Sequence, residues 1–282
     1  MTRMSLAAAL AFACGTALAQ GKAADLERGK YLVEGVMACG HCHAARVNGE
    51  RKPALGLAGG IALPEPTYRA FAPNITPDPE TGIGKWSDAE LGRAIREGIR
   101  PDGSVIGPPM PFDSYRAISD DDLRAIVVYL RAQPAVRNDV PKSVYPEQLK
   151  PYGPPLAKVS GPDPRDRIAT GKYLVELAHC MGCHTPRDEK GMALKQFTGA
   201  GGQLLKRPYG DSLSRNLTPH ESGLRDWTQA QFAAALRENV SPQGIKYKPV
   251  MPTAAYGTIA DADIAAMLAY LRSLPPLPFG GR

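Results

Sequence analysis

A five-residue pattern that occurs twice constrains this chain more than any other feature. Residues 39–43 read CGHCH and residues 180–184 read CMGCH, so in each copy two cysteines stand three apart and a histidine follows the second. The offset of 141 residues between the copies also relates other identical residues. These pairs are Trp86 with Trp227, Met110 with Met251, Tyr115 with Tyr256, and the Tyr-Leu-Arg run at 129–131 with that at 270–272. The chain is therefore a tandem duplication.

Two further matches follow an offset of 142 residues instead. The run GKYLVE at 29–34 recurs at 171–176, and Asn74-Ile-Thr-Pro recurs as Asn216-Leu-Thr-Pro. We interpret each one-residue change of offset as an insertion or deletion in a loop. The stretch between the copies is dense in proline with little helical periodicity, which predicts a semi-extended linker lying along both domains. The predicted bounds are domain 1 at 23–133, the linker at 134–166, domain 2 at 167–275 and a C-terminal tail at 276–282.

Residues 1–19 have the pattern of a cleavable signal peptide. Arg3 precedes a short apolar run, and Ala17-Leu-Ala19 forms an A-x-A-type cleavage site. The run is too short to span a bilayer, and no later stretch is long and apolar enough. We expect a periplasmic protein that is soluble or, at most, peripheral on the inner membrane.

The charge pattern does not favour nucleic-acid binding. The formal net charge is +6 and the isoelectric point is about 9.0. Basic and acidic residues alternate throughout, however, and no basic cluster with interleaved aromatic residues occurs. We therefore expect no nucleic-acid partner.

Each half is predicted to be mainly α-helical. A first helix carries Tyr31 and leads into the Cys motif. A second opens with a capping box, Ser87-x-x-Glu90 or Thr228-x-x-Gln231, and the last runs from near Ser119 or Asp261 to just before Pro134 or Pro275. No convincing alternating strands occur. Loops are long and large apolar residues few, so another group should fill the interior.

The pattern C-x-x-C-H is the attachment signature of c-type haem. Cys39 and Cys42, and likewise Cys180 and Cys183, would add to the haem vinyl groups, since a spacing of three places both sulfurs on one helical turn. His43 and His184 would then ligate the iron. A thioredoxin-like redox site would need a βαβ setting, a joint zinc site would leave both histidines unexplained, and disulfides this short would constrain the unfolded chain little.

Met110 and Met251 are the candidate sixth ligands. Each lies 67 residues after its histidine, and each is followed by a proline, Pro111 or Pro252. A stiff loop that presents a thioether suits an axial ligand and raises the reduction potential. The alternative is that both methionines only fill the core.

Several other residues keep two interpretations. His41, His179 and His220 could ligate iron in a bis-histidine scheme, or face solvent or bind backbone. Trp86 and Trp227 are either packing anchors at a helix start or point the indole N–H toward a haem propionate. Asn74 and Asn216 are turn formers that could also lie near the propionates.

These motifs together resemble a known family. The chain is similar over 25–133 and 167–275 to the multihaem cytochrome c subunits of proteobacterial alcohol, gluconate, sorbitol and fructose dehydrogenases. The resemblance implies two tandem class I cytochrome c-like domains, each wrapped around one covalent haem c. It implies the axial pairs His43 with Met110 and His184 with Met251. It also implies a periplasmic dehydrogenase as electron donor.

The leading functional hypothesis is a dihaem electron carrier that is not itself an enzyme. Electrons would pass one at a time toward a quinone, another cytochrome or a terminal oxidase. The alternative is a dihaem cytochrome c peroxidase-type enzyme, which needs one iron with an open position. The two matching Met loops favour the carrier, because they offer both irons the same ligand.

Overall fold

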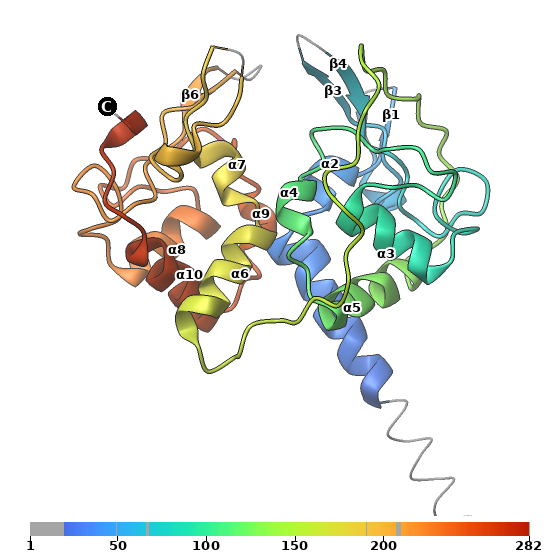
Figure 1. Ribbon diagram of the computed structural model, residues 1–282, viewed down its shortest axis with the longest axis horizontal. Coiled ribbons are helices and arrows are strands. Elements are labelled where there is room, and N and C mark those ends of the chain that lie inside the picture. The colour runs from blue at the N-terminus through green and yellow to red at the C-terminus, as the bar shows by residue number, and fades with distance from the viewer. Residues whose placement is uncertain (1–19, 49, 66–67, 190, 207–209, 282) are drawn as a thin grey trace, which may run out of the picture.

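The computed structural model describes residues 20–48, 50–65, 68–189, 191–206 and 210–281. Two lobes lie side by side, the first half of the chain on the right of Figure 1 and the second half on the left. The helix at the N-terminal end of the described chain projects below the first lobe. The signal peptide predicted for residues 1–19 lies outside the described residues.

In the first half, a helix over 20–30 continues into a π-helical turn, η1 (Tyr31–Val36), and the Cys motif forms α2 (Gly40–His43). The other elements of this half, in chain order, are β1 (Arg46–Val47), β2 (Glu50–Arg51), η2 (Pro53–Leu55), β3 (Ala62–Glu65), β4 (Tyr68–Phe71), α3 (Asp88–Glu97), α4 (Phe112–Tyr115) and α5 (Asp120–Arg131).

The second half repeats this order with shorter hairpins. Its elements are α6 (Arg167–Leu177), α7 (Cys180–His184), η3 (Lys195–Phe197), β5 (Leu204–Leu205), β6 (Ser212–Leu213), α8 (Gln229–Arg237), α9 (Thr253–Tyr256), α10 (Asp261–Ser273) and η4 (Phe279–Gly281).

The strands form three antiparallel hairpins, β1–β2, β3–β4 and β5–β6. The mainly helical prediction is confirmed, but the expectation that strands would be absent is wrong. Each strand has only two to four residues, and so short a segment shows no recognisable alternation of apolar and polar residues.

The helix starts follow the predicted capping signals. In α3 the Ser87 side chain accepts from the Glu90 backbone N–H while the Glu90 carboxylate accepts from the Ser87 N–H. Thr228 and Gln231 make the same reciprocal pair at α8. These side chains satisfy backbone N–H groups that have no partner within the helix, so both helices begin where the sequence predicted.

The first and last helices of each half cross at a glycine. A Cβ atom on Gly29 would lie 2.1 Å from the Ala125 carbonyl oxygen, and one on Gly171 would lie 1.9 Å from the Ala266 carbonyl oxygen. No other residue fits at this separation. Close helix contact therefore explains why GKYLVE begins with glycine in both halves.

One change of offset falls in a helix rather than in a loop, which corrects our interpretation of it. GKYLVE matches at offset 142 and the cysteines at 141, so the first half holds one extra residue between Glu34 and Cys39. In this half the Met37 N–H bonds to the Leu32 carbonyl, five residues back, at 2.8 Å. A π turn is the usual way in which a helix accommodates one inserted residue.

The two halves pack through one shared hydrophobic core cluster and two matching hydrogen bonds. The Tyr31 hydroxyl donates to the Asp263 carboxylate at 2.5 Å, and the Tyr173 hydroxyl donates to the Asp122 carboxylate at 2.8 Å. Tyr31 and Tyr173 occupy equivalent positions in the repeat, as do Asp122 and Asp263. The interface is therefore approximately two-fold symmetric, and it holds the halves as one unit.

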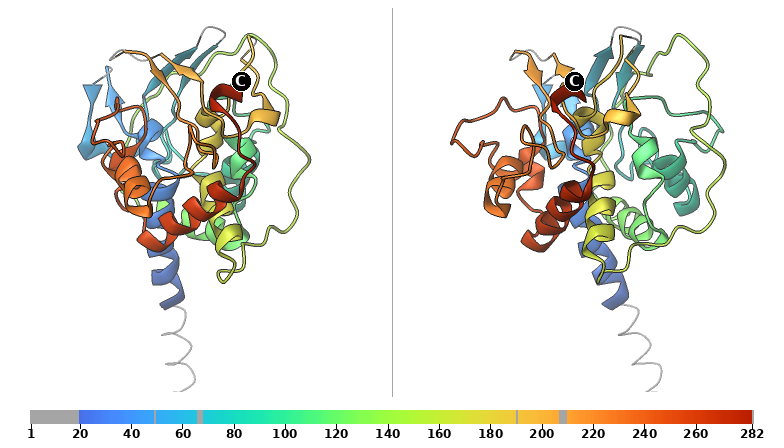
Figure 2. Two further views of the ribbon diagram at one scale, coloured as in Figure 1. Left: turned by 90° about the vertical axis from the view of Figure 1, so that its left-hand side faces the viewer. Right: turned by 60° about the vertical axis from the view of Figure 1, so that its left-hand side comes forward.

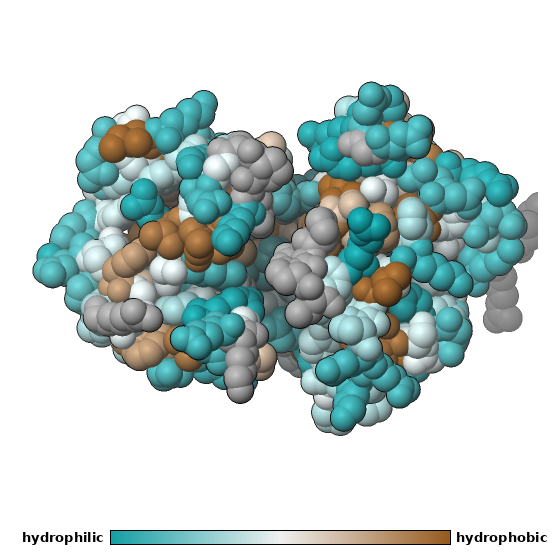
Figure 3. All heavy atoms as spheres, turned by 90° about the horizontal axis from the view of Figure 1, so that it is seen from above, coloured by the Kyte–Doolittle hydropathy of each residue, from teal (hydrophilic) through white to brown (hydrophobic). Residues whose placement is uncertain are grey.

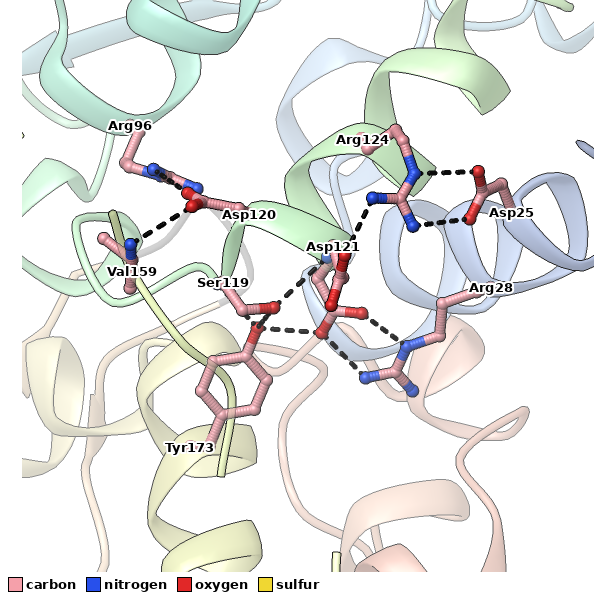
Figure 4. Close-up of polar contacts among 10 residues, drawn as sticks. Asp25, Arg28, Arg96, Ser119, Asp120, Asp121, Arg124, Val159 and Tyr173 are labelled. Carbon is pink, nitrogen blue, oxygen red and sulfur yellow. Dashed lines mark hydrogen bonds and ion pairs between the residues drawn. The ribbon is translucent and has the colours of Figure 1, made fainter. Parts of the chain in front are cut away.

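The Asp122 side of this interface carries an additional ion pair (Figure 4). Arg28 reaches Asp122 with two hydrogen bonds of 2.8 Å, and the Ser119 backbone N–H donates to the Tyr173 hydroxyl at 3.1 Å. Position 170, which matches Arg28 in the repeat, is a threonine. Only one side of the symmetric interface thus has a guanidinium.

The linker packs along the first half, not along both halves as the sequence suggested. Val144 pairs with Arg69 of β4 in both directions, and the Val159 carbonyl accepts from the Asp120 N–H at 2.9 Å. Figures 1 and 2 show the linker rising to the β3–β4 hairpin and returning down to α6.

The asparagines of the two Asn-x-Thr-Pro segments fasten the chain that follows each last helix. Asn74 donates to the Val136 carbonyl at 2.7 Å, and Asn216 donates to the Leu277 carbonyl at 2.7 Å. Asn74 and Asn216 also accept from the N–H two residues later, which forms the predicted turn. The start of the linker and the C-terminal tail therefore play the same structural part.

Candidate functional site

Each Cys motif forms a single helical turn. In α2 the His43 N–H bonds to the Cys39 carbonyl at 2.8 Å and the Cys42 N–H bonds to the same carbonyl at 3.2 Å. α7 places Cys180, Cys183 and His184 in one short helix. Residues three apart on a helix lie on one face, so the two thiols of each motif can reach one edge of a planar group.

The thiols are chemically available in this arrangement. No disulfide joins the four cysteines of the described residues. Burial raises the pKa of Cys39 to about 12, as it does that of Cys180, and the neighbouring cysteine in each motif adds to the shift. Among the residues that the structure places, no group of three or more His, Cys, Asp or Glu side chains could hold a metal ion, so the two CxxC pairs do not assemble into one zinc site.

The two histidines have the same protonation and orientation. Nδ1 of His43 lies 2.9 Å from the Pro73 carbonyl oxygen, and Nδ1 of His184 lies 2.7 Å from that of Arg215. A carbonyl only accepts, so Nδ1 carries the proton and Nε2 keeps its lone pair. Burial lowers the pKa of both imidazoles. Both are therefore neutral bases of the kind that ligates metals.

The two methionines also share a setting. Met110 and Met251 directly precede the proline that caps α4 or α9, and each methionine carbonyl accepts from the N–H two residues later, at 3.0 and 2.8 Å. Both side chains are half-buried against the hydrophobic core cluster, which Cys39 and Cys180 also contact. The structure thus places each thioether beside the same apolar interior as its Cys motif.

Two tyrosines belong to the site that the sequence analysis left without a role. Tyr115 and Tyr256 are buried, and burial raises their pKa well above the ordinary value, with the cysteines of the same half adding to the shift. The Tyr256 hydroxyl donates to the Ala178 carbonyl at 3.3 Å, two residues before Cys180. Their common offset of 141 was the available signal.

The three remaining histidines have different surroundings. His41 is exposed on α2. His179 is the N-cap of α7, with a left-handed backbone (φ 42°), and packs edge-on against Tyr115 with ring centroids 6.3 Å apart. His220 shares a hydrogen bond with the Ser222 hydroxyl at 2.9 Å. No two of them lie in equivalent places in the halves, in contrast to the two methionines.

The tryptophans mark a second repeated contact. The guanidinium of Arg131 donates to the Trp86 carbonyl, and that of Arg272 donates to the Trp227 carbonyl. Both indoles are partly buried against the core cluster. The Tyr-Leu-Arg repeat is thus explained, because its arginine ties the last helix to the loop that precedes α3 or α8.

Known proteins match the chain over both halves. The family model described as Cytochrome c matches residues 26–134 and 168–275. The cytochrome c subunit of the alcohol dehydrogenase (quinone) of Gluconacetobacter polyoxogenes is 32% identical over 298 residues, which cover 96% of this chain and 61% of that protein. The gluconate 2-dehydrogenase cytochrome c subunit of Pantoea cypripedii is 29% identical over 313 residues, or 97% of this chain and 65% of that protein.

A relative of similar length also matches. The "Diheme cytochrome c-type" protein of Cereibacter sphaeroides is 32% identical over 253 residues, which cover 85% of this chain and 82% of that protein. The chain spans about three fifths of the length of the alcohol dehydrogenase subunits it matches. These matches confirm the resemblance that the motifs indicated.

Proposed function

The chain belongs to the cytochrome c family, and from that premise we propose that it carries electrons one at a time for a periplasmic dehydrogenase. The donor is this dehydrogenase, and the acceptor is a quinone, another cytochrome or a terminal oxidase. Relatives named as cytochrome c subunits of alcohol, gluconate and fructose dehydrogenases support this role. The protein is the electron-transfer component and not the catalytic subunit.

Two haem c groups are the cofactors of this function. Cys39 and Cys42 hold the first covalently, and Cys180 and Cys183 hold the second. The axial pairs are His43 with Met110 and His184 with Met251. The domains are those predicted, 23–133 and 167–275, each enclosing one haem.

The observation that carries the proposal is the state of the two imidazoles. In each half Nδ1 is held by a backbone carbonyl, which orients the ring and leaves Nε2 unprotonated. This hydrogen bond also raises the basicity of the ligand. The donor set of two thiols, one imidazole and one thioether fits haem c.

Each chain residue has a defined part in this mechanism. The bound haem supplies the one-electron couple, and the protein sets its potential and its access. The prolines after Met110 and Met251 fix the thioether, which stabilises the reduced state. Because the same ligands serve both oxidation states, little reorganisation accompanies electron transfer. Tyr115 and Tyr256 keep water out of the interior beside the cysteines.

The cellular location we propose is the periplasm, reached through a cleavable signal at residues 1–19. Those residues lie outside the described part of the chain. In the part that the structure does describe, no helix combines the length and apolar character that a membrane span requires. Any membrane association we propose is peripheral.

The test uses methionine variants of the haem-loaded protein, one half at a time. The wild type should be heavier than its polypeptide by two haem masses and should show a far-red sulfur-to-iron charge-transfer band. Met110→Ala and Met251→Ala should each remove about half of that band, and the double variant all of it. Met192→Ala, an exposed methionine far along the loop, is the control. A band that survives in the double variant would refute the proposed ligands.

A peroxidase-type function makes the opposite prediction. With a methionine on both irons, the wild type should neither reduce hydrogen peroxide at enzymatic rates nor bind carbon monoxide rapidly when reduced. Either single methionine variant should gain carbon monoxide binding at one haem. Enzymatic peroxide reduction by the wild type would overturn the electron-carrier proposal.

A further inference from the structure

The loop that carries the candidate methionine ligand is covered in the first half. A Cβ atom on Gly107 would lie 2.4 Å from Cζ of Tyr145 and 2.8 Å from Cδ1 of Leu149, both in the linker. The Tyr145 hydroxyl also donates to the Pro108 carbonyl at 2.8 Å. A partner protein therefore cannot reach this part of the Met110 loop without displacing the linker.

The equivalent loop of the second half is open and basic. The bridge between Ile99 and Val105 in the first half matches that between Val240 and Lys246, so Val105 and Gly107 correspond to Lys246 and Lys248. Both lysines are exposed. Where the linker covers the first half, the second half thus presents two ammonium groups.

Neighbouring side chains extend this charge into a surface. The Lys248 ammonium donates to the Asp211 carbonyl at 2.6 Å, which joins the loop to the β5–β6 hairpin. The Arg215 guanidinium lies over the Tyr247 ring at 4.9 Å. No carboxylate of the described residues forms an ion pair with Arg215, Lys246 or Lys248. Their positive charge is therefore available to a partner.

Apolar side chains accompany these charges. Leu213 is 50% exposed and Ile245 is 64% exposed. Viewed from above, the second half shows apolar groups at its surface with hydrophilic residues around them (Figure 3). Apolar contact area with a polar, charged rim is the composition of protein–protein interfaces. We call Leu213, Arg215, Ile245, Lys246 and Lys248 the basic face.

The basic face lies next to the ligands proposed for the second haem. The Arg215 carbonyl is the group that holds Nδ1 of His184. Lys248 stands three residues before Met251 in the same loop. A protein bound on this face would therefore approach the second redox centre and not the first.

The overall charges of the halves differ in the same sense. Residues 26–134 contain 13 Lys and Arg against 14 Asp and Glu, while residues 168–275 contain 12 against 9. A field of one sign speeds encounter with a partner of the opposite sign and orients it. The second half therefore attracts acidic surfaces more strongly than the first.

We propose that the basic face is the docking surface for an acidic redox partner protein, so that electrons enter or leave through the second half. This inference rests on the proposed function and adds to it the partner's charge and the half that it contacts. The first half then exchanges electrons with the partner through the second, across the interface that fixes the two halves together.

The test compares two variants of equal charge change in the haem-loaded protein. Lys246→Gln with Lys248→Gln neutralises the basic face. Lys142→Gln with Lys150→Gln neutralises two exposed lysines on the linker that covers the first half. The probe is a carboxylate-terminated monolayer on gold, with binding followed by surface plasmon resonance at low and high salt. The basic-face variant should bind about tenfold more weakly at low salt, and the linker variant should match the wild type.

Equal weakening in both variants, or in neither, would overturn the proposal. So would sedimentation that shows the wild type to self-associate through the same lysines, because the face would then bind a second copy of the chain. Lys246→Glu, which disturbs no hydrogen bond of Lys248, checks that any loss reflects charge and not misfolding. Redox titration with small mediators tests the proposed function separately: if it finds no haem couple, the electron carrier fails whatever the monolayer shows.

Discussion

The two halves of the chain reach the same motif geometry along helices of different length. The first half holds one more residue than the second between the glutamate of GKYLVE and the first cysteine, and absorbs it as a π turn. Both halves then place a left-handed residue directly before the cysteine, Ala38 with φ 50° and His179 with φ 42°. The helix that leads to the motif tolerates variation, whereas the last step into the motif does not.

The difference has a cause in the packing between halves. Gly35 lies in the π turn, and a Cβ atom there would be 2.6 Å from Oγ1 of Thr258 in the other half. The residue at the matching position in the second half, Leu177, is fully buried and carries a full side chain. The π turn thus brings backbone, and not a side chain, to the interface on one side only.

The largest effect should come from removing one haem attachment at a time. Cys39→Ser with Cys42→Ser should lower the mass of the loaded protein by one haem and leave the second half able to bind its own. Cys180→Ser with Cys183→Ser should give the converse result. Mass spectrometry and haem absorbance measure both. Because the halves share a hydrophobic core cluster, loss of both haems from either variant would show that the halves do not load independently.

The π turn should not accept a side chain at its glycine. Gly35→Ala forces a shift at the interface with Thr258, so we expect a loss of about 1–3 kcal/mol in the free energy of unfolding, as for other overpacked sites. Gly182→Ala in α7 is the control, since a Cβ atom there meets nothing within 4 Å. Denaturant unfolding compares the two. An effect of Gly35→Ala no larger than that of the control would remove the packing explanation of the π turn.

The two sides of the symmetric interface should respond unequally to loss of their matched residues. Arg28→Ala leaves the buried Asp122 with Tyr173 and Ser119 only, and we expect a loss of about 1–2 kcal/mol, discounted because Arg28 is 39% exposed. Thr170→Ala removes the matching side chain in the second half and should change little. Thermal unfolding distinguishes them, and equal shifts would show that the ion pair contributes nothing.

The smallest effect should be a difference in acid response between equivalent loops. Asp78 accepts from the N–H groups of Glu80 and Thr81, and these hydrogen bonds hold the pKa of its carboxyl below the ordinary value. The stabilisation is therefore present above about pH 4 and is lost as the pH falls through the lowered pKa. Position 220, a histidine, occupies the matching place.

Amide hydrogen exchange as a function of pH would measure this difference. Protection at Thr81 should fall on acidification, and Asp78→Asn should remove that pH dependence. The Ser222 amide of the second half provides the comparison. If its protection changes with pH as that of Thr81 does, then Asp78 is not responsible.

Residues close in the chain allowed the sequence to predict much of the site. The capping boxes at Ser87 and Thr228 act over three residues, so α3 and α8 began as expected. The Cys motifs act over five residues, so their helical turns were predictable too. The carbonyls that hold His43 and His184 were not, because a backbone carbonyl of any residue can accept and leaves no signal in the sequence.

The identity of the family and the chemistry of two covalent attachments were thus determined by the sequence itself, through short motifs and their repetition. The tertiary structure alone decided that Tyr31 meets Asp263, that the linker covers one Met loop, and that the other is left open and basic. The physical reason is range. Capping and covalent anchoring depend on atoms within one or two helical turns, whereas these contacts join residues tens to hundreds of positions apart, whose meeting depends on how the whole chain packs.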